Sequence, residues 1–165
     1  MATTDLSKYD PDQIPAASDM RFGIVVSDWN RDITWKLLDG ALGTLKKHGA
    51  IDSNIVTEHV PGSFELPLAA QLLKENNNID ALICLGCVIR GETPHFTYVC
   101  QGVTQGISRL NLEYNTPFIF GLLTTDTLQQ AIDRSGGRHG NKGDEAALTA
   151  IRMVALKRKI SQNPF

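Results

Sequence analysis

The sequence has little cysteine, no long apolar run and almost no net charge, and each shortage excludes a class of protein. Three cysteines in 165 residues, an odd number, argue against a framework of disulfides. No apolar run approaches the roughly 20 residues that a membrane-spanning helix needs. A formal net charge of −2 gives no reason to expect nucleic acid or an anionic membrane as a partner.

The first 20 residues also lack the marks of a targeting sequence. They contain acidic residues and no apolar core region, unlike a secretory signal or an Arg-rich transit peptide. We therefore expect a cytoplasmic protein. Two prolines and many polar residues leave this segment unable to build a core alone, so residues 1–20 are expected to form a flexible or externally docked arm. A single domain is expected over residues 21–160.

Cys84 and Cys87 have the C-x-x-C spacing that can indicate a metal or redox site. In an extended strand, residues three apart point to opposite faces, so the two sulfurs cannot bind one ion. The sequence offers no second Cys or His pair to complete a four-ligand zinc site. We interpret these cysteines as buried structural thiols and expect no metal.

The strongest signal lies in residues 81–100, ALICLGCVIRGETPHFTYVC. Residues 81–89 form a continuous apolar run, typical of a strand buried on both faces. A helix is predicted afterwards, because Thr93 can cap it, a proline follows and apolar residues then recur at helical spacing. The turn at 90–93 would present unpaired N–H groups at a helix N-terminus, which favours an anion site. His95 would place a titratable imidazole beside that site.

Apolar patterning predicts further strands and helices on both sides of this stretch. The other strands are expected at 21–27, 54–60 and 118–124, and the other helices at 32–48, 63–75, 127–135 and 142–159. The strand at 54–60 is more polar and suits a sheet edge, and Asp126 or Thr127 can cap the short helix. Residues 136–140 are expected to form a flexible glycine loop.

This alternation implies an α/β fold with a parallel sheet and helices on both faces. In such sheets, ligands bind at the carboxyl ends of the strands. The segments that directly follow strands should therefore gather on one edge: 28–30, 61–65, 90–95 and 124–126.

The motif GCVIRGETPHF at 86–96 resembles the signature of the lumazine synthases. Four other motifs of that family appear in order: WN at 29–30, PGSFELP at 61–67, FGLLTT at 120–125 and GNKGDEA at 140–146. The match runs from about residue 21 to residue 159. The resemblance implies a three-layer, flavodoxin-like sandwich with a four-stranded parallel sheet.

Members of this family condense 5-amino-6-(D-ribitylamino)uracil with 3,4-dihydroxy-2-butanone 4-phosphate. The products are 6,7-dimethyl-8-ribityllumazine, phosphate and water. The resemblance therefore implies a transferase of riboflavin biosynthesis that needs no cofactor or metal. It also implies a homo-oligomer, a pentamer that some members assemble into a decamer or a 60-subunit shell, with riboflavin synthase as a further partner.

The resemblance assigns roles to residues within these motifs. His95 would be the catalytic group that moves protons. Phosphate binding would fall to Glu92, Thr93 and Arg134, the arginine acting across a subunit interface. Substrate binding would fall to Trp29, which stacks on the pyrimidine, and to Ser63, Phe64, Glu65, Cys87, Val88, Ile89 and Phe120, the last from the adjacent subunit.

Each of these residues also has a purely structural interpretation. His95 could be an ordinary polar residue of a first helical turn, and Trp29 could cover the sheet edge. Glu65 could favour a helix dipole, and Arg134 could be a solvated charge. Lys142 matches its motif by resemblance alone. The other histidines lack such context and are interpreted as surface residues: His48, His59 and His139.

Three positions depart from the family pattern. Glu92 stands where a smaller or neutral residue is common, and Thr97 stands where an acid often follows the histidine. Asp28 precedes the aromatic residue where arginine is frequent. None of these changes removes a group that the reaction requires.

Two alternatives remain open beside the enzyme. A non-catalytic flavin- or lumazine-binding protein would need Trp29 and the ribityl contacts, but not the phosphate turn, Arg134 or His95. A purely structural shell protein would leave the whole cluster at the strand ends unexplained.

Overall fold

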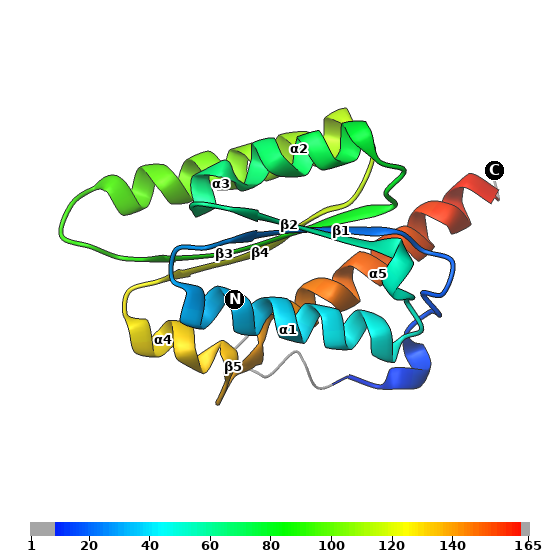
Figure 1. Ribbon diagram of the computed structural model, residues 1–165, viewed down its shortest axis with the longest axis horizontal. Helices are drawn as coiled ribbons and strands as arrows, with labels where there is room; N and C mark the ends of the chain where they lie inside the picture. The colour runs from blue at the N-terminus through cyan, green and yellow to red at the C-terminus, as the bar shows by residue number, and fades with distance from the viewer. Residues whose placement is uncertain (1–8, 163–165) are drawn as a thin grey trace.

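A four-stranded parallel sheet forms the middle layer of the computed structural model, which describes residues 9–162 (Figure 1). Its strand order is β2-β1-β3-β4. The strands are β1 (Phe22–Ser27), β2 (Ile55–Val60), β3 (Ala81–Ile89) and β4 (Phe118–Thr125). β2 pairs only with β1, so the predicted polar edge strand is confirmed.

Helices cover both faces of this sheet. One face carries α2 (Leu66–Asn76) and α3 (His95–Glu113), and the other carries α1 (Arg31–Lys47), α4 (Leu128–Asp133) and α5 (Lys142–Gln162) (Figure 1). The three-layer α/β sandwich expected from the sequence is confirmed. No helix within 9–162 is long and apolar enough to span a membrane.

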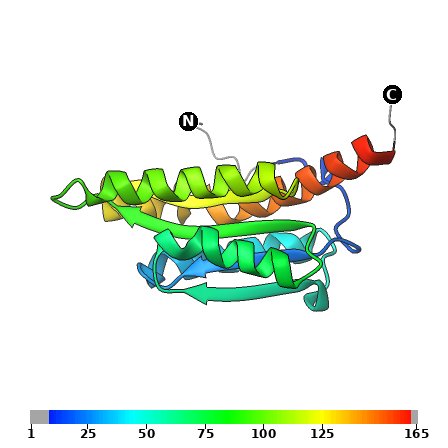
Figure 2. The same ribbon diagram turned by 90° about the horizontal axis from the view of Figure 1, so that it is seen from above.

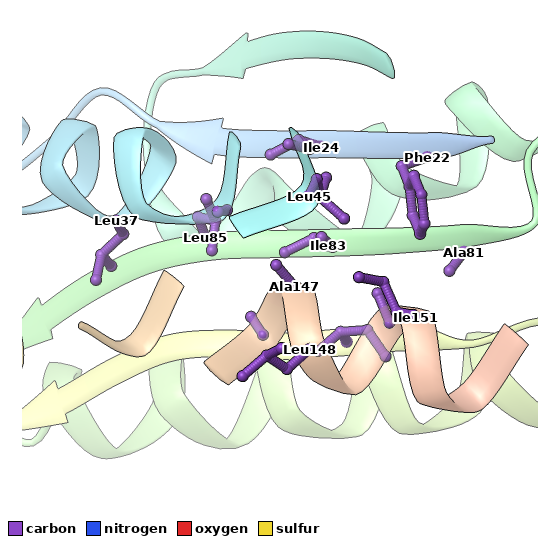
Figure 3. Packing of buried hydrophobic residues seen from close by; sticks show 14 of the residues in the cluster. Phe22, Ile24, Leu37, Leu45, Ala81, Ile83, Leu85, Ala147, Leu148 and Ile151 are labelled. Carbon is purple, nitrogen blue, oxygen red and sulfur yellow. The ribbon is translucent and has the colours of Figure 1, made fainter. Parts of the chain in front are cut away.

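The core has two halves because successive strand residues point to opposite faces of the sheet. Toward α1 and α5, the buried residues include Phe22, Ile24, Leu37, Leu45, Ile83, Leu85, Ala147 and Ile151 (Figure 3). Toward α2 and α3 they include Val25, Leu82, Val103, Ile107 and Leu110. Cys84 belongs to the second half and Cys87 to the first, so the two thiols lie on opposite faces, as their spacing predicts.

Of three expected helix starts, two differ in the structure and one is confirmed. The helix expected from Ser63 begins as a 3₁₀ turn at Ser63–Glu65 and becomes α-helical at Leu66. The turn before α3 ends at Pro94, and no side chain caps that helix, so Thr93 does not act as its cap. Thr127 does cap α4, its hydroxyl accepting a hydrogen bond from the Gln130 N–H at 3.2 Å.

The expected glycine loop at 136–140 forms a small hairpin instead. Its strands are β5 (Ser135–Gly137) and β6 (Gly140–Asn141), which pair antiparallel. Gly136 and Gly140 have φ of 108° and 76°. Such backbone angles are readily adopted by glycine, so glycines that looked like markers of flexibility allow a tight turn.

Residues 9–20 pack on the C-terminal end of α1. The Ala17 N–H donates to the His48 carbonyl at 2.8 Å, and the Tyr9 hydroxyl lies 2.7 Å from His48 Nε2. Ile14 and Met20 are buried. Residues 1–8 of the expected arm lie outside the described residues. External docking of the arm stays a prediction.

Both views place the turn between β3 and α3 beyond the end of the sheet toward which the strands point (Figure 2). The first turns of α1, α3 and α4 follow strand ends at this same edge. The fold therefore gathers the segments 28–30, 61–65 and 90–95 as expected from parallel topology.

Candidate active site

A pocket of about 490 Å³ opens where β1, β2 and β3 end and α3 begins. Its size and its apolar, aromatic lining suit a small-molecule ligand. It brings together eight of the residues that the sequence singled out: Trp29, Ser63, Phe64, Glu65, Cys87, Val88, Ile89 and His95. Asn30, Tyr98 and Val99 complete the lining.

Trp29 leaves the end of β1 with 67% of its surface exposed. The main-chain N–H of Trp29 donates to the Pro61 carbonyl at 3.0 Å. This hydrogen bond joins Trp29 to the segment after β2. A Cβ added to Gly62 would lie 2.6 Å from the indole ring. The ring therefore packs against the glycine backbone on one side and remains accessible for stacking.

Asn30 links the ends of β1 and β3. It adopts φ 61° and ψ 43°, a left-handed conformation that asparagine tolerates better than most residues. Its side-chain N–H donates to the Cys87 carbonyl at 2.9 Å. The left-handed conformation of Asn30 lets α1 begin two residues after the pocket residue Trp29. The Asn30 side-chain amide holds the ends of β1 and β3, two walls of the pocket, at a fixed distance.

The 61–65 segment is held by its own hydrogen bond and by a close backbone approach. Glu65 Oε2 accepts from the Gly62 N–H at 3.0 Å, which leaves Oε1 available to a ligand. Ser63 is buried against Gly86 of β3, where an added Cβ would lie 2.7 Å from the serine oxygen. Glycine at position 86 thus lets the turn lie flat on the central strand.

Cys87 supplies an apolar wall rather than a nucleophile. Burial raises the pKa of its thiol to about 12, so the thiolate that reacts as a nucleophile is scarce at neutral pH. Val88 and Ile89 follow it as half-buried residues at the end of β3. A ligand at this wall meets apolar side chains and the main chain of a strand end.

His95 is the first residue of α3 and lines the pocket. Tyr98 and Val99 stand three and four residues later, on the same face of the helix. Sequence reasoning missed both as site residues, and missed Asn30 from the site although it belongs to the WN motif. The signal for Tyr98 and Val99 was available, since their helical spacing from His95 places them beside it.

The turn between β3 and α3 is anchored by Arg90. Its Nε donates to Asp126 Oδ1 at 2.6 Å, and its guanidinium lies 4.3 Å from the centre of the Phe96 ring. These contacts tie the turn to the segment after β4. Glu92 and Thr93 are exposed within it, and the uncapped start of α3 leaves main-chain N–H groups facing this turn.

Arg134 lies outside the pocket, at the C-terminal end of α4. Its carbonyl accepts the Lys142 N–H at 2.9 Å, and its guanidinium has no hydrogen bond or ion pair with residues 9–162. Neighbouring charges are paired, Arg138 with the buried Asp133 at 2.9 Å and Lys142 with Glu145 at 2.8 Å. Arg134 is thus a half-buried cation free to meet an anion.

Phe120 is also outside the pocket. It lies on β4, the edge strand farthest from β2, and borders a different hollow with Cys100, Thr104 and Thr124. About a third of its surface is exposed. Among residues 9–162, no group of three His, Cys, Asp or Glu side chains could hold a metal ion.

Comparison with known proteins agrees with this arrangement. A family model described as 6,7-dimethyl-8-ribityllumazine synthase matches residues 19–158. The chain belongs to this family. The resemblance seen in its motifs is confirmed, and the five motifs lie within the matched region.

Several curated relatives carry the same name, 6,7-dimethyl-8-ribityllumazine synthase. The one from Parabacteroides distasonis is 64% identical over 156 residues, which cover 93% of this chain and 98% of the relative. The one from Phocaeicola vulgatus is 57% identical over 164 residues, 98% of each chain. The one from Porphyromonas gingivalis is 53% identical over 96% of this chain and 99% of its own. Membership in the lumazine synthase family thus extends over the whole domain.

Proposed function

We propose that this chain catalyses the formation of 6,7-dimethyl-8-ribityllumazine from 5-amino-6-(D-ribitylamino)uracil and 3,4-dihydroxy-2-butanone 4-phosphate. One observation carries the proposal: in a chain of the lumazine synthase family, a single pocket combines the Trp29 ring, the Glu65 carboxylate and the His95 imidazole. This combination suits a flat, hydroxylated heterocycle that must exchange protons. The chemistry requires no cofactor or metal.

The pyrimidine would occupy the pocket, with its ring on the exposed face of Trp29. The free Oε1 of Glu65 would accept hydrogen bonds from ribityl hydroxyls, since Oε2 is engaged with the Gly62 N–H. The Ser63 and Phe64 side chains and the strand end at 87–89 would complete the contacts. A neutral Cys87 thiol and two aliphatic side chains suit a heterocycle held mainly by main-chain groups.

The butanone phosphate would bind at the turn after β3. Main-chain N–H groups of Glu92 and Thr93 and the positive end of the α3 dipole favour a dianion there. Arg134 would add a charge-assisted hydrogen bond. The exposed Glu92 carboxylate must then point away from the phosphate.

Arg134 and Phe120 lie outside the pocket of their own chain, so we propose that a neighbouring subunit supplies them. A pentamer, assembled further into a decamer or a 60-subunit shell, would provide such shared sites. Exposed apolar side chains support an oligomer, because Leu112, Met153 and Ile160 line a groove between α3 and α5. We also propose a cytoplasmic location and riboflavin synthase as the enzyme that uses the product.

The reaction would begin with attack of the uracil amine on the ketone carbonyl, giving a Schiff base and one water. Elimination of phosphate follows, and ring closure releases a second water. Orientation of two substrates can contribute roughly 7–11 kcal/mol to such a reaction. Proton transfer by His95 typically adds roughly 10²–10⁴-fold. The fold contributes chiefly by holding both substrates in register.

Mixing the purified protein with both substrates tests the proposal. Lumazine absorbance and phosphate release would be followed together, beside a buffer blank that corrects for any uncatalysed reaction. Clear acceleration by wild type, strongly reduced in Arg134→Ala, is expected. Tight binding of a ribityl-lumazine without acceleration would contradict the enzyme and favour the binding protein.

A further inference from the structure

His59, interpreted from the sequence as an ordinary surface residue, has a specific partner beside the pocket. Its Nδ1 lies 3.0 Å from Oδ1 of Asp28, the residue that directly precedes Trp29. His59 is near the end of β2, and Asp28 follows the last residue of β1. The pair therefore joins the two strand ends that carry the pocket's aromatic wall.

This link has structural consequences because β2 is an edge strand held from one side only. Past the last paired residues, Ser27 and Val60, the ends are joined by two main-chain hydrogen bonds, from Asp28 to Val60 at 2.8 Å and from Trp29 to Pro61 at 3.0 Å. Among the described residues, no other side-chain hydrogen bond connects these two ends. Movement between the ends would shift the Trp29 ring relative to Gly62, against which it packs.

The surroundings of the pair are built from α1. The Trp35 ring meets the His59 ring edge-on with centres 5.8 Å apart, and the Arg31 guanidinium lies 4.7 Å above the Trp35 ring. Arg31 also approaches Asp28 Oδ1 at 3.9 Å. The charged groups facing the imidazole are thus Asp28 from β1 and, behind it, Arg31 from α1; Glu58 precedes His59 on β2 and points to the opposite side of the strand.

Asp28 is the acceptor of this contact. The hydrogen bond from His59 lowers the pKa of the Asp28 carboxyl, with the nearby His59 and Arg31 charges acting in the same direction against desolvation. Asp28 is then ionised throughout the neutral range. Because an ionised carboxylate can only accept, Nδ1 of His59 is the donor of the hydrogen bond.

We infer that the His59–Asp28 hydrogen bond is a positioning device that holds Trp29 in place for stacking on the pyrimidine substrate. The inference rests on the proposed function, since it takes the pyrimidine as the ligand of Trp29. His59 does not touch the reacting atoms. It acts on substrate affinity and leaves the chemical step to the residues lining the pocket.

The test is calorimetric binding of 5-amino-6-(D-ribitylamino)uracil to the full chain. Both members of the pair are partly exposed, so the effect is modest. His59→Phe keeps a ring against Trp35 and loses the hydrogen bond, so its Kd should be about two- to fivefold larger than that of wild type, because exposed pairs have coupling of this size. His59→Gln keeps a side-chain donor, so its Kd should match wild type.

Two further variants sharpen the result. Asp28→Ala removes the acceptor, so it should raise Kd by the same factor as His59→Phe. His48→Gln is the matched control, since His48 is bonded to Tyr9 at the far end of α1 and should leave Kd unchanged.

Steady-state kinetics separates positioning from general structural damage. In His59→Phe, KM for the pyrimidine should rise while kcat and KM for the butanone phosphate stay within about twofold of wild type. Equal Kd values for the pyrimidine in wild type and His59→Phe would overturn the inference and leave the proposed function intact. No pyrimidine binding and no turnover by wild type would instead overturn the proposed function.

Discussion

The two halves of the candidate site differ in how much of each a single chain assembles. The half proposed for the heterocycle is almost entirely built by one chain, because the ends of β1, β2 and β3 converge and hydrogen bonds fix Trp29, Asn30 and Glu65. Of the residues proposed for this half, Phe120 alone lies outside the pocket. The half proposed for the phosphate is dispersed. Glu92 and Thr93 are exposed in a turn, and Arg134 lies beyond the pocket with a guanidinium that pairs with no residue in the described part of its chain.

This difference reflects the groups that each half needs to bind its proposed ligand. Recognition of a flat ring needs one aromatic face and a few main-chain groups, and parallel strand ends supply both within one domain. Holding a phosphate beside that ring needs a positive charge on the side of the phosphate that faces away from the α3 turn. We expect the heterocycle half to depend mainly on single residues of one chain, and the phosphate half to depend on assembly.

The largest effect is expected from removing the Arg134 guanidinium. Arg134→Ala should lower kcat/KM by about 10³-fold, because loss of phosphate orientation removes both positioning and charge stabilisation. His95→Ala should lose only about 10²-fold, the low end for one acid–base group. Steady-state kinetics on both variants gives the ranking, with Arg134→Lys as the control that keeps charge but not the planar fork. A larger loss for His95→Ala would reverse our view of the two contributions.

Mixing those two variants tests whether the site is shared between chains. If the pocket of one subunit uses Arg134 of its neighbour, random assembly of His95→Ala with Arg134→Ala subunits should restore about one quarter of the sites. The mixture would then be tens of times more active than the average of its parents. The variants would be unfolded together, refolded and assayed beside each variant refolded alone. No gain on mixing would mean that the arginine acts within its own chain.

Sequence reasoning could place the heterocycle half because parallel topology constrains it. Apolar runs located the strands, and residues after strands necessarily meet at one edge, which placed Trp29, Glu65 and His95 correctly together. The link between His59 and Asp28 could not be foreseen, since it depends on the register of β2 against β1. Val26 pairs with His59 and Ser27 with Val60, and no local pattern encodes that offset.

Other features were not predicted because the residue types involved fit more than one local structure. Glycines at 136 and 140 suit both a mobile loop and the positive φ of a tight hairpin, and only the pairing of β5 with β6 distinguishes them. The uncapped start of α3 was missed because Thr93 is a good capping residue by type. Phe120 does not line the pocket formed by residues 9–162 of its own chain, so a single sequence gives its role by resemblance alone.

A smaller effect is expected from filling the space beneath the aromatic wall. In Gly62→Ala the new methyl would lie 2.6 Å from the indole ring of Trp29, so the ring must shift. We expect KM for the pyrimidine to rise about fivefold, within the range of one aromatic stacking contact, and KM for the butanone phosphate to stay unchanged. Gly43→Ala is a matched control, since an added Cβ there meets nothing within 4 Å and the residue lies in α1 away from the pocket lining. Equal KM values for the pyrimidine in wild type and Gly62→Ala would mean that the Trp29 packing seen here does not govern binding.

The smallest effect is expected at the thiol in the pocket wall. Burial raises the pKa of Cys87 to about 12, so at pH 8 only about one thiol in 10⁴ is ionised, too few for nucleophilic catalysis. Cys87→Ala should therefore keep kcat/KM within about twofold of wild type, although the small cavity costs about 1 kcal/mol of unfolding free energy. Kinetics from pH 6 to 9, with urea denaturation to confirm folding, checks both expectations. A loss of kcat/KM near 10²-fold in a folded variant would give the thiol a chemical role. The heterocycle half would then take part in the reaction as well as bind the ring.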